Sequence, residues 1–113
     1  MDVQVRNKHL PISSQKLRLV CDQVRGMGAD QALTVLRFMP QKGAEFVQKS
    51  VASAVANAVN NFDLNRESLY VATIYADEGP SMKRMKAGAR GRYKPRIKRT
   101  SHLTVVLSER EES

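Results

Sequence analysis

The residues of this 113-residue chain that could carry chemistry are mostly lysines and arginines, and they gather in the segment 80–101. This segment holds 9 of the 19 basic residues and no acidic residue, whereas the rest of the chain has 10 basic and all 11 acidic residues. The formal net charge of +8 therefore comes from one segment. A like-charge block of this size is typical of a solvated tail or of a polyanion-binding surface. The nine residues are Lys83, Arg84, Lys86, Arg90, Arg92, Lys94, Arg96, Lys98 and Arg99.

The segments on either side favour an ordered arm over a disordered basic linker. Residues 69–76 and 103–107 are rich in β-branched and aromatic residues, which are enriched in strands. Positions 69 and 107 also lie symmetrically about Gly88. This symmetry about a glycine predicts a long β-hairpin that projects beyond the rest of the domain.

The symmetry also predicts a register for the hairpin. It sets Asp77 opposite Arg99 and Glu78 opposite Lys98. Opposite charges directly across a hairpin stabilise it modestly and help to define its register. We therefore expect these two pairs to lie at the base of the arm.

Upstream of the arm, the sequence predicts one short strand and three helices. Val3 and Val5 alternate with polar residues, which indicates a strand with one buried face. Apolar residues at helical spacing predict helices over about 14–25, 30–38 and 41–61. We expect an α+β fold, in which three helices pack on a small antiparallel sheet with a long protruding basic β-hairpin. The buried face of the third helix should comprise Val47, Val51, Ala54, Val55, Ala58 and Phe62.

Composition limits the class of protein. A hydrophobic fraction of 42% supports a core, and we expect residues 1–113 to form a single domain with 80–101 as an arm within it. No apolar run approaches the roughly 18 residues of a membrane span, and no secretory signal is present, so we expect a cytoplasmic protein. The single cysteine, Cys21, lies in the apolar stripe of the first helix and should be an inert core thiol.

Catalytic and metal-binding residue types are present but do not form a recognisable site. His9, His102 and Cys21 show no ligand pair at zinc spacing. Ser101 and His102 are adjacent on a predicted strand, so their side chains should point to opposite faces. We therefore expect no enzymatic activity, no metal and no cofactor, and we interpret His102 as a structural residue opposite Ile74.

The predicted arm fits folded RNA. Basic residues along a narrow ribbon can meet phosphates on both sides and release counterions, and arginine and Tyr93 can stack on bases. Small Gly88, Ala89 and Gly91 keep the tip thin enough to enter between RNA helices. A secondary contact surface is predicted at Lys8, Lys16 and Arg18.

Two other classes of protein stay open at this point. An architectural DNA-binding protein with a basic β-arm is one, although such arms commonly insert an apolar or proline wedge, and this tip has glycine and alanine. An RNA-processing enzyme is the other, although the chain lacks an acid, base or metal cluster.

Three motifs in the C-terminal half are distinctive: DEGPSMKR at 77–84, RGR at 90–92 and KRTSHLTVV at 98–106. Together they closely resemble the ribosomal protein L-twenty-two family of the bacterial large subunit. The family pattern is also similar to AVANA at 54–58 and to four residues of the first helix: Ser13, Lys16, Arg18 and Val20.

The resemblance implies a structural constituent of the large ribosomal subunit that binds 23S rRNA, supports assembly and, as a monomer, contacts neighbouring ribosomal proteins. It implies a domain on the outside of the subunit and a hairpin that runs through the rRNA to the exit tunnel and the nascent polypeptide. Where the family usually has Pro followed by Arg at the tip, this chain has Ala87-Gly88. The tunnel-lining tip would comprise Met85, Lys86, Ala87, Gly88, Ala89, Arg90, Gly91 and Arg92.

Overall fold

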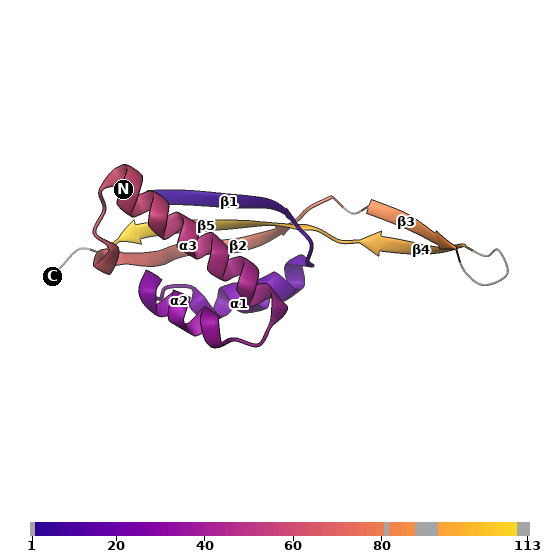
Figure 1. Ribbon diagram of the computed structural model, residues 1–113, viewed down its shortest axis with the longest axis horizontal. Helices are drawn as coiled ribbons and strands as arrows, with labels where there is room; N and C mark the ends of the chain where they lie inside the picture. Colours follow the sequence, from indigo (N-terminus) through magenta and orange to yellow (C-terminus); the bar gives the residue numbers. More distant parts are fainter. Residues whose placement is uncertain (1, 81, 88–92, 111–113) are drawn as a thin grey trace.

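A narrow arm projects from one end of a layered α+β core (Figure 1). The computed structural model describes residues 2–80, 82–87 and 93–110, and for residues 82–87 and 93–98 it describes the backbone. The molecule measures 68 × 25 × 18 Å, and its radius of gyration is 17.2 Å. A compact domain of this length has a radius of gyration of roughly 13 Å, so the arm accounts for the elongation. Within the described residues the elements are β1 (Asp2–Leu10), α1 (Ser14–Val24), α2 (Ala29–Phe38), α3 (Lys42–Phe62), η1 (Arg66–Ser68), β2 (Leu69–Glu78), β3 (Met82–Ala87), β4 (Tyr93–Lys98) and β5 (Ser101–Glu109).

β5 is the central strand of the core sheet. Among the described residues the strand order is β1-β5-β2, and both pairs are antiparallel. Alternate residues of β5, Leu103, Val105 and Leu107, are fully buried because they face the helices, which cover one side of the sheet (Figure 1). β2 leads into β3, and β4 leads into β5. The arm therefore continues the direction of the core sheet (Figure 1). The predicted fold class is confirmed.

The strands are longer than the apolar patterns predicted. β1 continues past Val5 to Leu10, and β5 runs from Ser101 to Glu109 rather than from 103 to 107. Apolar alternation marks the part of a strand that faces the core, whereas backbone pairing continues through polar residues at both ends. Pro11 follows β1 directly and ends it, as expected.

Helix α1 forms as its sequence predicts. The Ser13 hydroxyl accepts a hydrogen bond from the Lys16 backbone N–H at 3.4 Å, which is the expected N-cap. The apolar stripe, Leu17, Val20, Cys21 and Val24, is fully buried. Burial raises the pKa of the Cys21 thiol to about 11, so the thiol stays protonated near neutral pH.

Helix α2 begins earlier than predicted. Gly28 is its N-cap, and Asp30 lies in its first turn, where a carboxylate interacts favourably with the helix dipole. The Asp30 carboxylate pairs with Arg66 of η1 at 2.8 Å. This exposed ion pair links the start of α2 to the segment that enters β2.

Helix α3 confirms five of its six predicted core residues and corrects the sixth. Val47, Val51, Ala54, Val55 and Ala58 are buried, but Phe62 is 45% exposed. The helix ends at this residue because Asp63 adopts the left-handed conformation, with φ 53°. Leu64 then turns back, donates its N–H to the Ala58 carbonyl, and packs against the core in place of Phe62.

Two leucines of α1 provide a matched test of this packing. Leu17 is 0% exposed and Leu19 is 63% exposed. Leu17→Ala should lower the free energy of unfolding by about 2–5 kcal/mol, because it leaves a cavity, whereas Leu19→Ala should change it by less than about 0.5 kcal/mol. Urea denaturation of both variants measures the difference, and equal losses would contradict this assignment of the buried face.

Candidate nucleic-acid interface

The arm is an antiparallel ribbon of β3 and β4. Lys83, Arg84 and Lys86 lie on β3, while Lys94, Arg96 and Lys98 lie on β4. Arg99 follows β4 directly. Tip residues 88–92 lie outside the described residues, and these include the other two predicted contact residues of the arm, Arg90 and Arg92. At the described end of the tip, Met85, Lys86 and Ala87 belong to β3.

Like charges oppose each other along this ribbon. Its register sets Arg84 opposite Arg96 and Lys86 opposite Lys94. Like charges at directly opposed positions of an antiparallel pair destabilise it. Neutralisation by a polyanion would therefore stabilise the ribbon, as expected of a segment that binds phosphates.

The register predicted from the sequence is wrong. Asp77 pairs with His102 instead of Arg99, and Glu78 pairs with Ser101 instead of Lys98. Two features cause the shift. Leu69 pairs with Glu109, two residues beyond its predicted partner, and a β-bulge between Val71 and Thr73 shifts the partners by one more residue. The predicted pairing of His102 with Ile74 is wrong for the same reason.

The arm joins the core through a close contact at Gly79. The Gly79 N–H donates to the Thr100 carbonyl at 2.9 Å, and the Thr100 hydroxyl donates to the Pro80 carbonyl at 2.8 Å. A Cβ at Gly79 would lie 2.5 Å from Thr100 Oγ1 and 3.2 Å from the Thr100 carbonyl carbon. A side chain at position 79 would therefore force the Thr100 side chain to move and would crowd the Thr100 backbone, so glycine suits this position.

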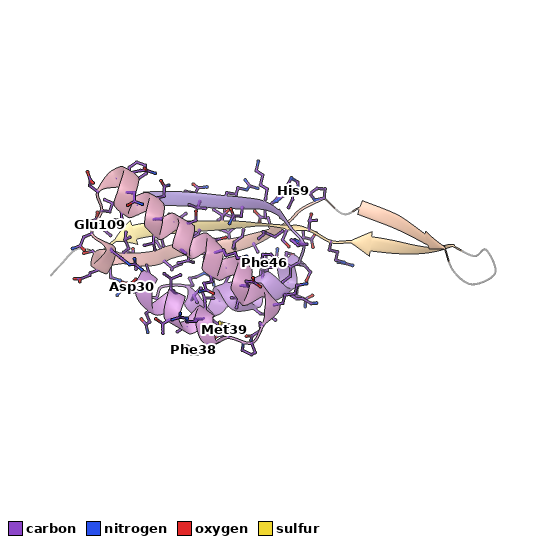
Figure 2. The ribbon with its side chains drawn as sticks, in the orientation of Figure 1. His9, Asp30, Phe38, Met39, Phe46 and Glu109 are labelled. Atoms are coloured by element: carbon purple, nitrogen blue, oxygen red, sulfur yellow. The ribbon has the colours of Figure 1, made fainter. Side chains whose placement is uncertain are left out.

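Two histidines meet at the same end of the sheet. The His9 backbone N–H donates to His102 Nδ1 at 3.1 Å, and the two rings lie edge to face with centroids 5.0 Å apart. His9 adopts the left-handed region, with φ 60°, at the end of the sheet nearest the arm (Figure 2). Because Nδ1 accepts a hydrogen bond, His102 is held as the neutral tautomer with its proton on Nε2.

The surroundings of His102 favour this neutral form. Partial burial lowers its pKa below the usual 6.5, and the nearby His9, Arg6 and Lys8 lower it further, while Asp77 acts in the opposite direction. These contacts join β1, β2 and β5 at the base of the arm. His102 thus contacts His9 and pairs with Asp77 rather than with Ile74, and its structural role stays a prediction.

The predicted secondary contact residues form two groups. Strand alternation places Lys8, like Arg6, on the sheet face away from the helices, and both are exposed. Lys16 and Arg18 are exposed on α1, which covers the other face. The structure therefore does not join Lys8 to Lys16 and Arg18 in one surface.

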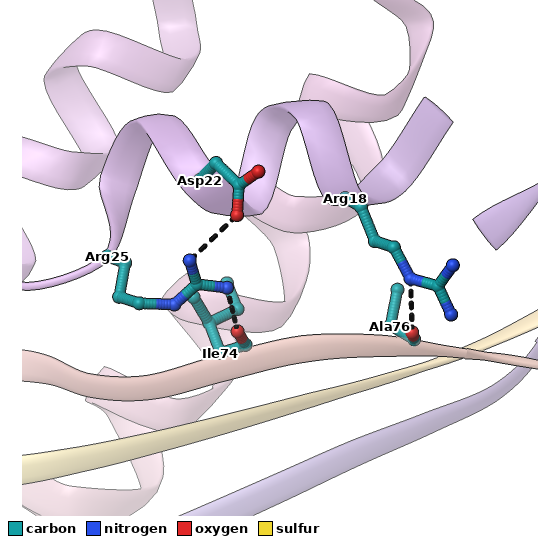
Figure 3. Close-up of polar contacts among 5 residues, drawn as sticks. All are labelled: Arg18, Asp22, Arg25, Ile74 and Ala76. Atoms are coloured by element: carbon teal, nitrogen blue, oxygen red, sulfur yellow. Dashed lines mark hydrogen bonds and ion pairs between the residues drawn. The ribbon is translucent and has the colours of Figure 1, made fainter. Parts of the chain in front are cut away.

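Two arginines of α1 hold the backbone of β2, with different consequences (Figure 3). One terminal N–H group of Arg25 donates a hydrogen bond to the Ile74 carbonyl at 2.8 Å, and the other donates to the Asp22 carboxylate at 2.7 Å. Arg18 donates Nε to the Ala76 carbonyl at 3.1 Å, and its terminal nitrogens have no hydrogen-bond partner in the described part of the chain. Arg25 is thus occupied, whereas Arg18 is oriented with two donor groups available.

A pocket of about 340 Å³ lies where the start of α1 meets the base of the arm. It brings together side chains from α1, from the end of β2 and from the residue before Thr100. Sequence reasoning identified Arg18 and Arg99 separately as basic contacts, but no sequence signal joined them to a carboxylate. The pocket is lined by Ser13, Ser14, Gln15, Arg18, Glu78 and Arg99.

Other kinds of site find no support in the described residues. Residues 2–80, 82–87 and 93–110 contain no cluster of three or more potential metal ligands. Nor does any helix in these ranges combine the length and hydrophobicity that crossing a membrane requires.

Comparison with known proteins identifies the family. The family model described as ribosomal protein L22p/L17e matches residues 5–108. The chain is 53% identical over 109 residues to large ribosomal subunit protein uL22 of Desulfotalea psychrophila. The matched residues cover 96% of this chain and 99% of that protein. It is 47% identical over 112 residues to the protein of the same name from Chloroflexus aggregans, with 99% of each chain covered. The chain belongs to the ribosomal protein L22p/L17e family.

Family membership confirms several predictions from the sequence. The chain is a ribosomal protein, a structural component rather than an enzyme, and its location is the ribosome in the cytoplasm. The resemblance noted from the DEGPSMKR and KRTSHLTVV motifs is confirmed as well.

Gly79→Ala should disturb the junction between the core of this ribosomal protein and its arm. The added methyl group would collide with Thr100, so we expect a loss of about 1–3 kcal/mol in the free energy of unfolding. The double variant Gly79→Ala, Thr100→Ala removes the hydroxyl and should recover part of the loss. A double-mutant cycle by urea denaturation measures this coupling, and strictly additive losses would contradict the contact.

His102→Gln should change the pH dependence of stability but not RNA affinity. Since the pKa of folded His102 is lowered, its contribution to stability is full above the unfolded value and is lost as the pH falls through the folded value. The stability advantage of the native chain over the variant should therefore shrink between about pH 7.5 and about pH 5.

RNA affinity near neutral pH should stay within about threefold, because His102 is interpreted as a structural residue rather than an RNA contact. Filter binding to large-subunit rRNA measures this. A loss of about a hundredfold with the fold intact would assign His102 to the interface instead.

Proposed function

We propose that this ribosomal protein binds 23S rRNA along its basic arm, supports assembly of the large subunit, and lines the polypeptide exit tunnel with the tip of the arm, residues 85–92. Its family membership makes it a structural constituent of the large ribosomal subunit. Its partners there are rRNA and neighbouring ribosomal proteins. The nascent polypeptide is the further partner that a tunnel-lining tip would meet.

The single observation that carries this proposal is the charge arrangement of the arm. Nine basic residues and no acidic residue lie between positions 80 and 101, and the ribbon places like charges opposite each other. Such a ribbon gains most from phosphates on both of its sides, which packed RNA helices provide and an isolated duplex does not.

The shape of the molecule supports a division of roles. The core is broader than the arm and would lie on the outer surface of the subunit. The arm is a two-stranded ribbon that makes the molecule 68 Å long. A narrow ribbon can enter between RNA helices while the core stays outside. Binding free energy should then be distributed along the arm, and each phosphate contact should add about 0.9 to the salt slope on duplex RNA and less on looped RNA.

Deleting residues 86–90 tests the separate role of the tip. This deletion removes two of the nine basic residues, Lys86 and Arg90, and leaves the base of the arm unchanged. Expressed as the only copy in a bacterium, the variant should still assemble into large subunits but should change macrolide sensitivity, because the tunnel wall differs. Sucrose-gradient profiles and inhibitory drug concentrations measure the two effects.

A matched control removes two basic residues at the base of the arm. Lys98→Gln, Arg99→Gln should weaken rRNA binding by about two phosphate contacts and slow assembly, and it should leave macrolide sensitivity unchanged. If instead the tip deletion abolished assembly without altering drug sensitivity, the roles of tip and base would have to be exchanged.

A further inference from the structure

We infer that the pocket between α1 and the base of the arm binds one ribose–phosphate unit of RNA. Arg18 and Arg99 would bind the phosphate, and the Glu78 carboxylate would accept a hydrogen bond from the ribose 2′-hydroxyl. This inference rests on the proposed RNA-binding function and adds a site that recognises the sugar.

The three charged residues reach the pocket from separate parts of the fold. Arg18 belongs to α1, Glu78 ends β2 and Arg99 precedes β5. Glu78 lies two residues after Ala76, so strand alternation turns it toward the helices, on the same side as the start of α1. Among the described residues, Glu78 makes no ion pair with either arginine. The cations and the carboxylate therefore line the pocket without neutralising one another by direct contact.

Arg18 is oriented before any ligand binds. Its Nε donates to the Ala76 carbonyl at 3.1 Å, and its terminal nitrogens point away from that carbonyl (Figure 3). A guanidinium fixed at one nitrogen loses less side-chain entropy when the other two bind an anion. Two terminal N–H groups in this geometry suit the paired oxygens of a phosphate.

The register of the sheet places Glu78 and Arg99 at the pocket. Glu78 pairs with Ser101, and the Ser101 hydroxyl donates to the Ile12 carbonyl just before α1. This buried contact ties the strand after Arg99 to the start of the helix. Had Glu78 paired with Lys98, as the sequence predicted, a direct ion pair would have occupied its carboxylate.

The size and composition of the pocket fit a nucleotide unit better than an isolated anion. Its volume of about 340 Å³ lies at the lower end of the range of small-molecule sites, about 300–1,000 Å³. An anion alone would be repelled by Glu78, whereas a ribose attached to the phosphate offers a hydroxyl donor to that carboxylate. Carboxylates bind ribose hydroxyls in the same way in dinucleotide sites. The 2′-hydroxyl is also the group that distinguishes RNA from DNA.

The ratio of affinities for RNA and DNA tests the inference. Fluorescence anisotropy with oligouridylate and with oligodeoxyuridylate of the same length gives this ratio for the full chain. We expect the native protein to prefer the ribose form by about fivefold, the effect of one hydrogen bond. Glu78→Ala should bring the ratio close to one. It should raise affinity for the deoxyribose form, because it removes a negative charge, whereas for the ribose form loss of the hydrogen bond opposes this gain.

Matched controls separate recognition from general charge effects. Glu109→Ala removes a carboxylate at the opposite end of β5, so it should leave the ratio unchanged. Arg18→Gln should lower the salt slope on both oligonucleotides by about 0.7, whereas Arg25→Gln, whose guanidinium is already paired, should not.

Three outcomes would overturn the inference. They are a native ratio near one, a ratio that Glu78→Ala leaves unchanged, or an effect of Glu78→Ala that disappears when oligoadenylate replaces oligouridylate. The last outcome would indicate that Glu78 contacts a base. In all three cases the proposed RNA-binding function stands, whereas failure of the native chain to bind either oligonucleotide or large-subunit rRNA would overturn that function itself.

Discussion

Repulsion between like charges across the arm is the constraint that the junction between core and arm must meet. The register sets Arg84 opposite Arg96 and Lys86 opposite Lys94, so the ribbon opposes its own formation. A two-stranded ribbon is at best marginally stable in water even without such repulsion. The core therefore aligns the strands at one end, and a bound polyanion, which under the proposed function is rRNA, would neutralise the charge along the rest.

The end of the core sheet is built to align the arm. β2 and β5 carry their pairing to Glu78 and Ser101, and the close contact between Gly79 and Thr100 continues it toward the arm. The hydrogen bond from His9 to His102 attaches β1 to the same end. These contacts are short and local, and they set the direction in which both strands leave the core. Small changes there should be amplified along the length of the arm.

Basic residues near this end differ in how many of their side-chain N–H groups already have hydrogen-bond partners within the protein. Arg25 is paired with Asp22 and the Ile74 carbonyl, so its charge stabilises the attachment of α1 to β2. Arg18 makes a related contact with Ala76 but keeps its terminal nitrogens available beside Arg99 and Glu78. Position on the helix therefore does not by itself show whether an arginine is available to bind a ligand. Both arginines contact a carbonyl of β2, and within the residues described only Arg25 also contacts a carboxylate, that of Asp22.

The sequence by itself determined the α+β class, the three helices, the buried stripe of α1 and the place of the basic arm. These depend on periodicity and composition over neighbouring residues, which are local properties. The tertiary structure decided the register, because the bulge between Val71 and Thr73 and the pairing of Leu69 with Glu109 depend on how distant strands meet. It likewise exposed Phe62, since Leu64 takes its place in the core. The pocket could not be predicted, because Arg18, Glu78 and Arg99 are distant in the chain and only that register brings them together.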